Sequence, residues 1–109
     1  MNFNEYQQLA KRTAMYPNLG DNILYPALGL CGEAGEVAEN VKKMIRDDGG
    51  KLSEKRRELL KKEVGDVLWY CAMLADELGF TLGEIAELNI AKLSDRQARG
   101  VIQGAGDER

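Results

Sequence analysis

Apolar residues recur at intervals of three and four along most of the chain, and this period constrains the fold more than any other feature of the sequence. The longest such patterns run from Leu24 to Ile45 and from Leu60 to Leu78. Intervals of three and four place side chains on one face of an α-helix, whereas a half-buried strand needs a period of two. The sequence therefore predicts an all-α protein.

Helix start and stop signals divide this pattern into four segments. We expect helices at about 4–16, from 21 or 22 to 46, from 54 to 78 and from 82 to about 99. Pro26 is compatible with the second helix only in its first turn, where no backbone hydrogen bond is lost. Ser53 suits an N-cap, Gly79 suits the position after a helix, and Thr81 with Glu84 has the spacing of a capping box.

The apolar stripes of these helices predict a modest shared core. The residues expected to face inward are Leu24, Leu28, Cys31, Ala38, Val41, Ile45, Leu60, Val64, Val67, Leu68, Cys71, Leu74, Ala75, Leu78, Ile85, Leu88 and Leu93. Because the two cysteines lie on these stripes without a CxxC spacing, we expect buried, reduced thiols. Short chains often complete a core by pairing with copies of themselves. We expect one domain, residues 1–109, with a four-helix bundle-like protomer completed by homo-oligomerisation into a dimer or tetramer.

Composition excludes several classes of protein. No apolar run approaches the roughly 18 residues of a membrane span, and the N-terminus lacks the apolar core of a signal peptide, so we expect a cytoplasmic protein without membrane contact. With 15 basic and 18 acidic residues, the chain has no basic field that favours nucleic acid. It contains no histidine. A metal site would therefore use oxygen ligands, which favours Mg²⁺ or Mn²⁺ over Zn²⁺.

Two pairs of acidic residues are the strongest chemical signal. Glu33 and Glu36 lie three apart in GEAGE, and Glu63 and Asp66 lie three apart in EVGD. Residues three apart share a helix face, and each pair is surrounded by small or apolar residues. On facing antiparallel helices, the four carboxylates would repel one another unless a divalent cation joined them. Either pair alone is also typical of a solvated helix face.

The two motifs resemble the ExxE and ExxD motifs of the MazG-like all-α nucleoside triphosphate pyrophosphohydrolases. The resemblance extends from about Leu24 to Arg99, and its specificity lies in the order of the motifs, their internal glycines and the following DVLWY. It implies Mg²⁺-dependent cleavage of a nucleoside triphosphate to the monophosphate and pyrophosphate. The metal ligands and catalytic residues that it implies are Glu33, Glu36, Glu63 and Asp66. Either Glu33 or Glu36 would serve as general base.

Several further residues are expected to contact the substrate. Lys43 lies seven residues after Glu36, which is about two helical turns, and Tyr70 lies four residues after Asp66. Trp69 is interpreted as packing in the core or at a subunit interface rather than as a platform for a base.

The last predicted helix has a polar and basic face formed by Asn89, Lys92, Arg96 and Arg99. The resemblance implies that Asn89 and Lys92 approach the phosphates, whereas Arg96 and Arg99 fit an exposed face equally well. The tail after Arg99 contains three glycines in seven residues and is expected to be irregular. Either it folds over the substrate and contributes Arg109, or it frays.

Alternative functions remain open at this stage. Within the same superfamily they are a dUTP or dCTP hydrolase and a phosphoribosyl-ATP pyrophosphohydrolase. An alternative of another class is a helical oligomerisation or regulatory module whose acids are surface charge. A nucleic-acid-binding module is disfavoured because acids and bases alternate along each helix.

Overall fold

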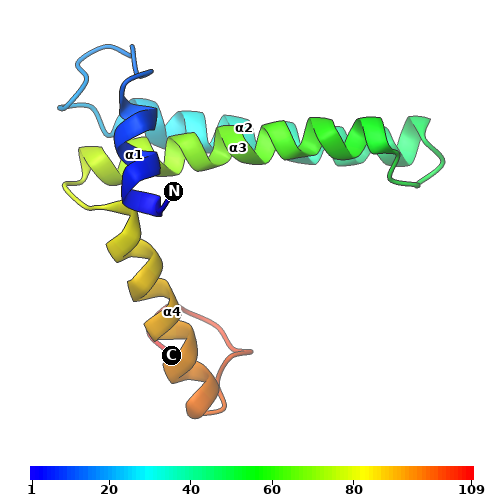
Figure 1. Ribbon diagram of the computed structural model, residues 1–109. Helices are drawn as coiled ribbons and strands as arrows, with labels where there is room; N and C mark the ends of the chain where they lie inside the picture. The colour runs from blue at the N-terminus through cyan, green and yellow to red at the C-terminus, as the bar shows by residue number, and fades with distance from the viewer.

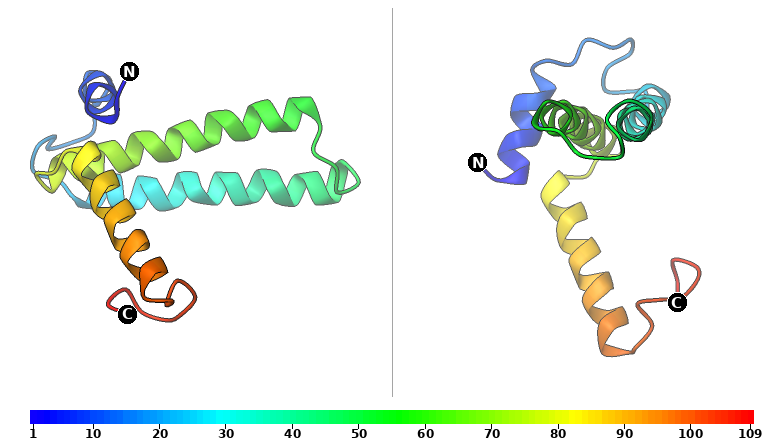
Figure 2. Two further views of the ribbon diagram at one scale, coloured as in Figure 1. Left: turned by 60° about the horizontal axis from the view of Figure 1, so that its bottom comes forward. Right: turned by 90° about the vertical axis from the view of Figure 1, so that its right-hand side faces the viewer.

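All 109 residues are described in the computed structural model, which contains four α-helices and no strand. In chain order the helices are α1 (Phe3–Lys11), α2 (Leu24–Asp47), α3 (Glu54–Glu77) and α4 (Leu82–Ala98). Figures 1 and 2 show α2 and α3 as a long antiparallel hairpin, with α1 across one end and α4 leaving that same end at a steep angle. The predicted all-α class is confirmed.

The termini of α3 and α4 carry the predicted caps. Ser53 Oγ accepts a hydrogen bond from the Arg56 N–H at 3.1 Å. Thr81 Oγ1 accepts from the Glu84 N–H at 3.1 Å, and Glu84 Oε1 accepts from the Thr81 N–H at 2.7 Å, which completes the capping box. Gly79 has a φ of +80°, the left-handed conformation that glycine adopts readily after a helix.

The first two helices differ from the expected boundaries. α1 ends at Lys11 rather than near Tyr16, and the Thr13 hydroxyl donates to the Ala10 carbonyl oxygen at 2.7 Å just after the helix. α2 begins at Leu24 rather than at 21 or 22, and Asn22 Oδ1 accepts a hydrogen bond from the Tyr25 N–H at 3.1 Å.

The connection between α1 and α2 is held to the end of α3 by one carboxylate. Glu77 Oε1 accepts the Tyr16 hydroxyl at 2.5 Å and the Gly20 N–H at 2.8 Å, and Oε2 accepts the Asn22 N–H at 3.1 Å. Burial opposes ionisation of Glu77, but these hydrogen bonds outweigh it and lower the pKa of the carboxyl. The loop is thus fixed by a charge-assisted clip.

The start of α4 is capped by side chains of α1. Gln7 Oε1 accepts the Leu82 N–H at 2.9 Å, while Gln7 Nε2 donates to the carbonyls of Ala72 and Phe80 at 3.3 and 3.1 Å. Asn4 Oδ1 accepts the next α4 amide, that of Gly83, at 2.8 Å. The first helix therefore determines where the last one begins.

The protomer has a small core. The buried apolar residues are Ala10, Tyr16, Pro26, Ala72, Met73, Ala75 and Leu82. α4 contacts α1 and α3 but not α2, so the four helices do not close into a bundle within one chain. None of the helices combines the length and apolarity that crossing a bilayer requires.

Much of the predicted inward surface is exposed in the protomer, which corrects the expected core. Leu24, Leu28 and Ile45 on α2 are 71%, 72% and 64% exposed, and Cys31 on the same stripe is exposed rather than buried. The remaining predicted core residues that are exposed are Ala38, Val41, Val64, Leu78, Ile85, Leu88 and Leu93. The reason is geometric: α2 presents a different face to α3, and α4 leaves the hairpin. Both cysteines are free, and Cys71 is half-buried.

Candidate metal centre

Three carboxylates from two helices converge on one point. Glu33 on α2 and Glu63 and Asp66 on α3 each place a carboxylate oxygen within 4.8 Å of those of the other two. Glu63 and Asp66 share a face of α3 because they are three residues apart, and the packing of α2 against α3 brings Glu33 opposite them. Glu33 and Glu63 are half-buried, and Asp66 is exposed.

The electrostatics of this acid trio (Glu33, Glu63 and Asp66) are repulsive. Burial and then the negative charges of Asp66, Glu63 and Glu36 raise the pKa of Glu33. Glu36 is exposed and does not belong to the converging set, although its charge reaches Glu33. The structure therefore brings together three of the four carboxylates that the motifs indicate, and keeps the fourth beside them.

A shallow pocket borders the acid trio and is lined by Thr13, Glu33, Asp66, Trp69 and Tyr70. Trp69 Nε1 donates to Thr13 Oγ1 at 2.8 Å, which links the segment just after α1 to the side of the pocket formed by α3. Trp69 also packs against the core, as expected, and meets the Tyr70 ring edge-on with centroids 5.0 Å apart. Thr13 was not predictable as a pocket residue, because nothing in its spacing in the sequence links it to Trp69.

Tyr70 lies at the centre of the aromatic and acidic groups. Burial, followed by the proximity of Tyr25 and Glu33, raises the pKa of the Tyr70 hydroxyl. Its ring packs over Gly29 so closely that a Cβ at that position would lie 2.2 Å from Tyr70 Cε1. Gly29 is thus the contact that lets Tyr70 reach the acid trio.

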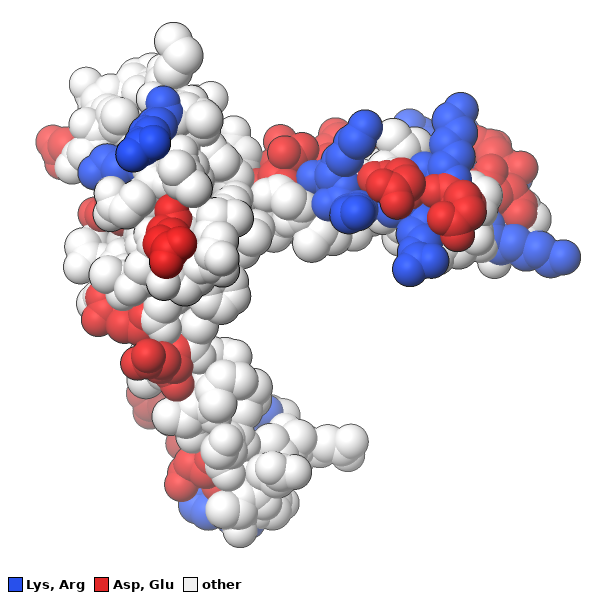
Figure 3. Space-filling model, viewed as in Figure 1, with Lys and Arg blue, Asp and Glu red and all other residues white.

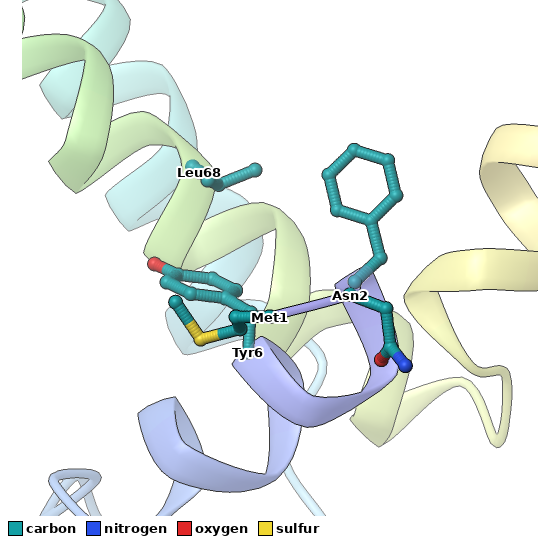
Figure 4. A pocket seen from close by; sticks show the side chains of 5 residues that line it. Met1, Asn2, Tyr6 and Leu68 are labelled. Atoms are coloured by element: carbon teal, nitrogen blue, oxygen red, sulfur yellow. The ribbon is translucent and has the colours of Figure 1, made fainter.

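An apolar pocket lies on the α1 side of the same region (Figure 4). It is lined by Met1, Asn2, Phe3, Tyr6 and Leu68. Burial raises the pKa of Tyr6, and the charge of Asp66 raises it further.

Lys43 lies further along the hairpin, near the Lys42–Glu39 and Arg46–Asp47 ion pairs. The pKa of Glu39 is lowered chiefly by its hydrogen bond with Lys42, at 2.8 Å, and the positive charge of Lys43 lowers it further. Figure 3 shows Lys and Arg gathered at this far end of α2 and α3 with Asp and Glu between them. On this face, acids and bases are mixed.

The basic face of α4 is separate from the acid trio within one protomer. Asn89 is exposed, and Lys92 and Arg96 both contact Asp107 of the tail. Arg99 is exposed and pairs with Asp95 at 2.8 Å. α4 leaves one end of the α2–α3 hairpin at a steep angle and extends away from it (Figures 1 and 2), so these residues do not meet the trio in a single chain.

Arg109 lies within the tail rather than over the acid trio. Its guanidinium donates to backbone carbonyls of the tail, and its own carbonyl oxygen accepts from Arg99 at 2.6 Å.

Comparison with known proteins adds the family. The MazG nucleotide pyrophosphohydrolase domain matches residues 22–101 of the chain. The chain is similar to the Gene 37 protein of Mycobacterium phage L5, with 45% identity over 114 aligned residues that cover 100% of both proteins. No solved structure matches it.

Proposed function

The chain belongs to the MazG nucleotide pyrophosphohydrolase family, and we propose that it hydrolyses a ribo- or deoxyribonucleoside triphosphate to the monophosphate and pyrophosphate. The reaction depends on Mg²⁺, which Mn²⁺ can replace. The observation that carries the proposal is the convergence of Glu33, Glu63 and Asp66 within 4.8 Å. The biological role of this hydrolysis would be control of a nucleotide pool or removal of noncanonical nucleotides.

The donor set fits a hard divalent cation. All three groups offer carboxylate oxygens, which Mg²⁺ and Mn²⁺ prefer, and the chain has no histidine to favour a softer metal. Burial and then the neighbouring negative charges raise the pKa of Glu33, and a cation would offset the repulsion between these charges. Divalent-cation chemistry at such a site polarises phosphoryl oxygens and lowers the pKa of water.

The residues around the trio have distinct roles in this proposal. Glu33, Glu63 and Asp66 hold the cation. Glu36, which is outside the trio and exposed, accepts the proton of the water that attacks the α-phosphorus. The Tyr70 hydroxyl donates to a phosphate oxygen, since Tyr70 lines the same pocket as Glu33 and Asp66.

The site also needs positive charge from a second copy of the chain. Lys43 and the α4 residues Asn89, Lys92, Arg96 and Arg99 are the groups proposed to contact the substrate. The α4 residues do not reach the trio in one protomer, and exposed apolar residues such as Leu28, 72% exposed, and Leu88, 70% exposed, favour a homo-oligomer. We therefore assign the α4 cations to the acid trio of a partner subunit.

A product assay tests the activity. Wild-type protein with Mg²⁺ or Mn²⁺ is offered a panel of nucleoside triphosphates and phosphoribosyl-ATP, and products are followed by ³¹P NMR. We expect monophosphate and pyrophosphate, with Asp66→Asn slower by roughly a hundredfold or more. Glu58→Gln is the matched control, because Glu58 is an exposed carboxylate of the same helix whose ion-pair partner, Lys61, is 4.0 Å away. Release of orthophosphate would contradict the mechanism, and absence of any hydrolysis would favour the non-catalytic module.

A mixing assay tests the assignment across subunits. If α4 serves the partner, combining inactive Asp66→Asn with inactive Lys92→Ala protein restores activity, because one of the two sites in a mixed dimer has both groups. If both groups act in one chain, the mixture stays inactive. Analytical ultracentrifugation of the wild type checks for the dimer or tetramer directly.

A further inference from the structure

The C-terminal tail is a closed loop rather than a frayed end. The Arg109 guanidinium donates to the carbonyl oxygens of Val101 at 3.0 Å, Ile102 at 2.8 Å and Gly106 at 2.6 Å. A Cβ at Gly104 would lie 2.7 Å from Arg109 Cδ, so glycine leaves room for this arrangement. Residues 100–109 contain no helix, as predicted, but they have a defined hydrogen-bonded shape.

This loop delivers a carboxylate to the basic face of α4. Asp107 Oδ1 lies 2.7 Å from Lys92 Nζ and 2.9 Å from Arg96 Nη2, and Arg96 also donates to the Asp107 carbonyl oxygen. The Arg96 side chain is only 6% exposed, whereas the Asp107 side chain is 77% exposed. The hydrogen bonds from Lys92 and Arg96 lower the pKa of Asp107. The tail therefore pairs both cations with one carboxylate, which offsets part of their positive charge.

We propose that residues 100–109 form a latch, in which Asp107 binds Lys92 and Arg96 at the place where a substrate phosphate binds them. Asp107 is displaced when the nucleotide binds. The inference rests on the proposed function, because that function assigns these cations to the phosphates. A carboxylate and a phosphoryl oxygen are alternative acceptors for the same charged N–H groups. The buried guanidinium can bind a phosphate only after Asp107 has moved away.

The geometry also indicates how tightly the latch holds. An exposed carboxylate forms ion pairs that are weakened by water and by salt, so the substrate can displace it easily. Removing the charge of Asp107 should strengthen phosphate binding between about twofold and tenfold, because its two ion pairs join an exposed carboxylate to one partly exposed and one buried cation.

The test compares wild-type protein with Asp107→Asn and Glu108→Gln. The two variants lose the same charge from adjacent positions, but only Asp107 pairs with Lys92 and Arg96, so Glu108→Gln controls for the general change in net charge. Two quantities are measured at fixed ionic strength: the Kd for inorganic tripolyphosphate in metal-free buffer, by titration calorimetry, and the KM and kcat for the best nucleoside triphosphate with Mg²⁺. We expect Asp107→Asn to lower Kd and KM by about two- to tenfold with kcat within about twofold, and Glu108→Gln to match the wild type. The difference in Kd between Asp107→Asn and the wild type should become smaller as the KCl concentration is raised.

The outcomes separate the latch from the catalytic proposal. If the two variants change affinity equally, or if Asp107→Asn weakens binding, Asp107 is not a competitor and the latch is wrong. If no triphosphate is hydrolysed but Asp107→Asn alone tightens tripolyphosphate binding, the catalytic proposal fails and the latch on this cation pair remains.

Discussion

Replacing Gln7 with leucine should destabilise the fold by about 3 kcal/mol. The side chain is 3% exposed and makes three hydrogen bonds that join α1, the end of α3 and the start of α4. Three bonds at a net value of about 1 kcal/mol each account for roughly 3 kcal/mol. Leaving the Leu82 N–H buried without an acceptor adds to this loss, and burying the apolar leucine offsets part of it. Leucine has nearly the same volume as glutamine, so no large cavity contributes.

The assay is urea unfolding, followed by Trp69 fluorescence at one protein concentration, with Gln8→Leu as the control. Gln8 is the next residue of α1 and is exposed, so its substitution should change the free energy of unfolding by no more than about 0.5 kcal/mol. A loss below about 1 kcal/mol for Gln7→Leu, or equal losses for both variants, would refute the view that Gln7 caps α4.

Three further outcomes follow from the structure. Hydrogen bonds lower the folded-state pKa of Glu77, so its contribution to stability is fully present above the unfolded-state pKa and is lost as pH falls through the folded-state pKa. Glu77→Gln should therefore lower the free energy of unfolding by about 1–3 kcal/mol at pH 7. Urea midpoints measured at successive pH values should show this difference from the wild type shrinking below about pH 4.3. Mg²⁺ at about a hundred times its Kd should stabilise the wild type by about 2.7 kcal/mol in thermal unfolding, and Asp66→Asn should lose most of this gain. Gly29→Ala would place a methyl group 2.2 Å from Tyr70 Cε1; overpacking of about 1–3 kcal/mol should exceed the roughly 1 kcal/mol gain in helix propensity, and calorimetry should show a lower Tm. The first expectation would be contradicted by an unchanged urea midpoint for Glu77→Gln at pH 7, and the second by equal stabilisation of Asp66→Asn and the wild type by Mg²⁺. A higher Tm for Gly29→Ala would contradict the third.

Local signals in the sequence were sufficient for most helix ends and for most of the acidic cluster. Ser53, Thr81, Glu84 and Gly79 act within a few residues of their own positions, so their spacing alone indicates the caps. The two motifs predicted four converging carboxylates, of which three converge and Glu36 stays outside. The pair on α3 follows helix periodicity, and α2 needs only to pack antiparallel to bring Glu33 across.

Contacts between distant parts of the chain were not predictable from periodicity. The direction of α4 depends on Asn4 and Gln7, whose side chains reach amides at positions 82 and 83. The exposure of Cys31 and its stripe depends on which face of α2 meets α3, and an apolar face is equally compatible with a core or with a subunit partner. The pairing of Asp107 with the α4 cations requires a folded tail, whereas three glycines indicated only an irregular one.

The bonds between the two ends of the chain also affect how the protein is made. Gln7 and Leu82 are 75 residues apart, so at about 5–20 residues per second the ribosome needs roughly 4–15 s to make the second partner after the first. Until then α1 lacks the α4 amides to which Asn4 and Gln7 bind. The first residues to be synthesised are therefore among the last to settle.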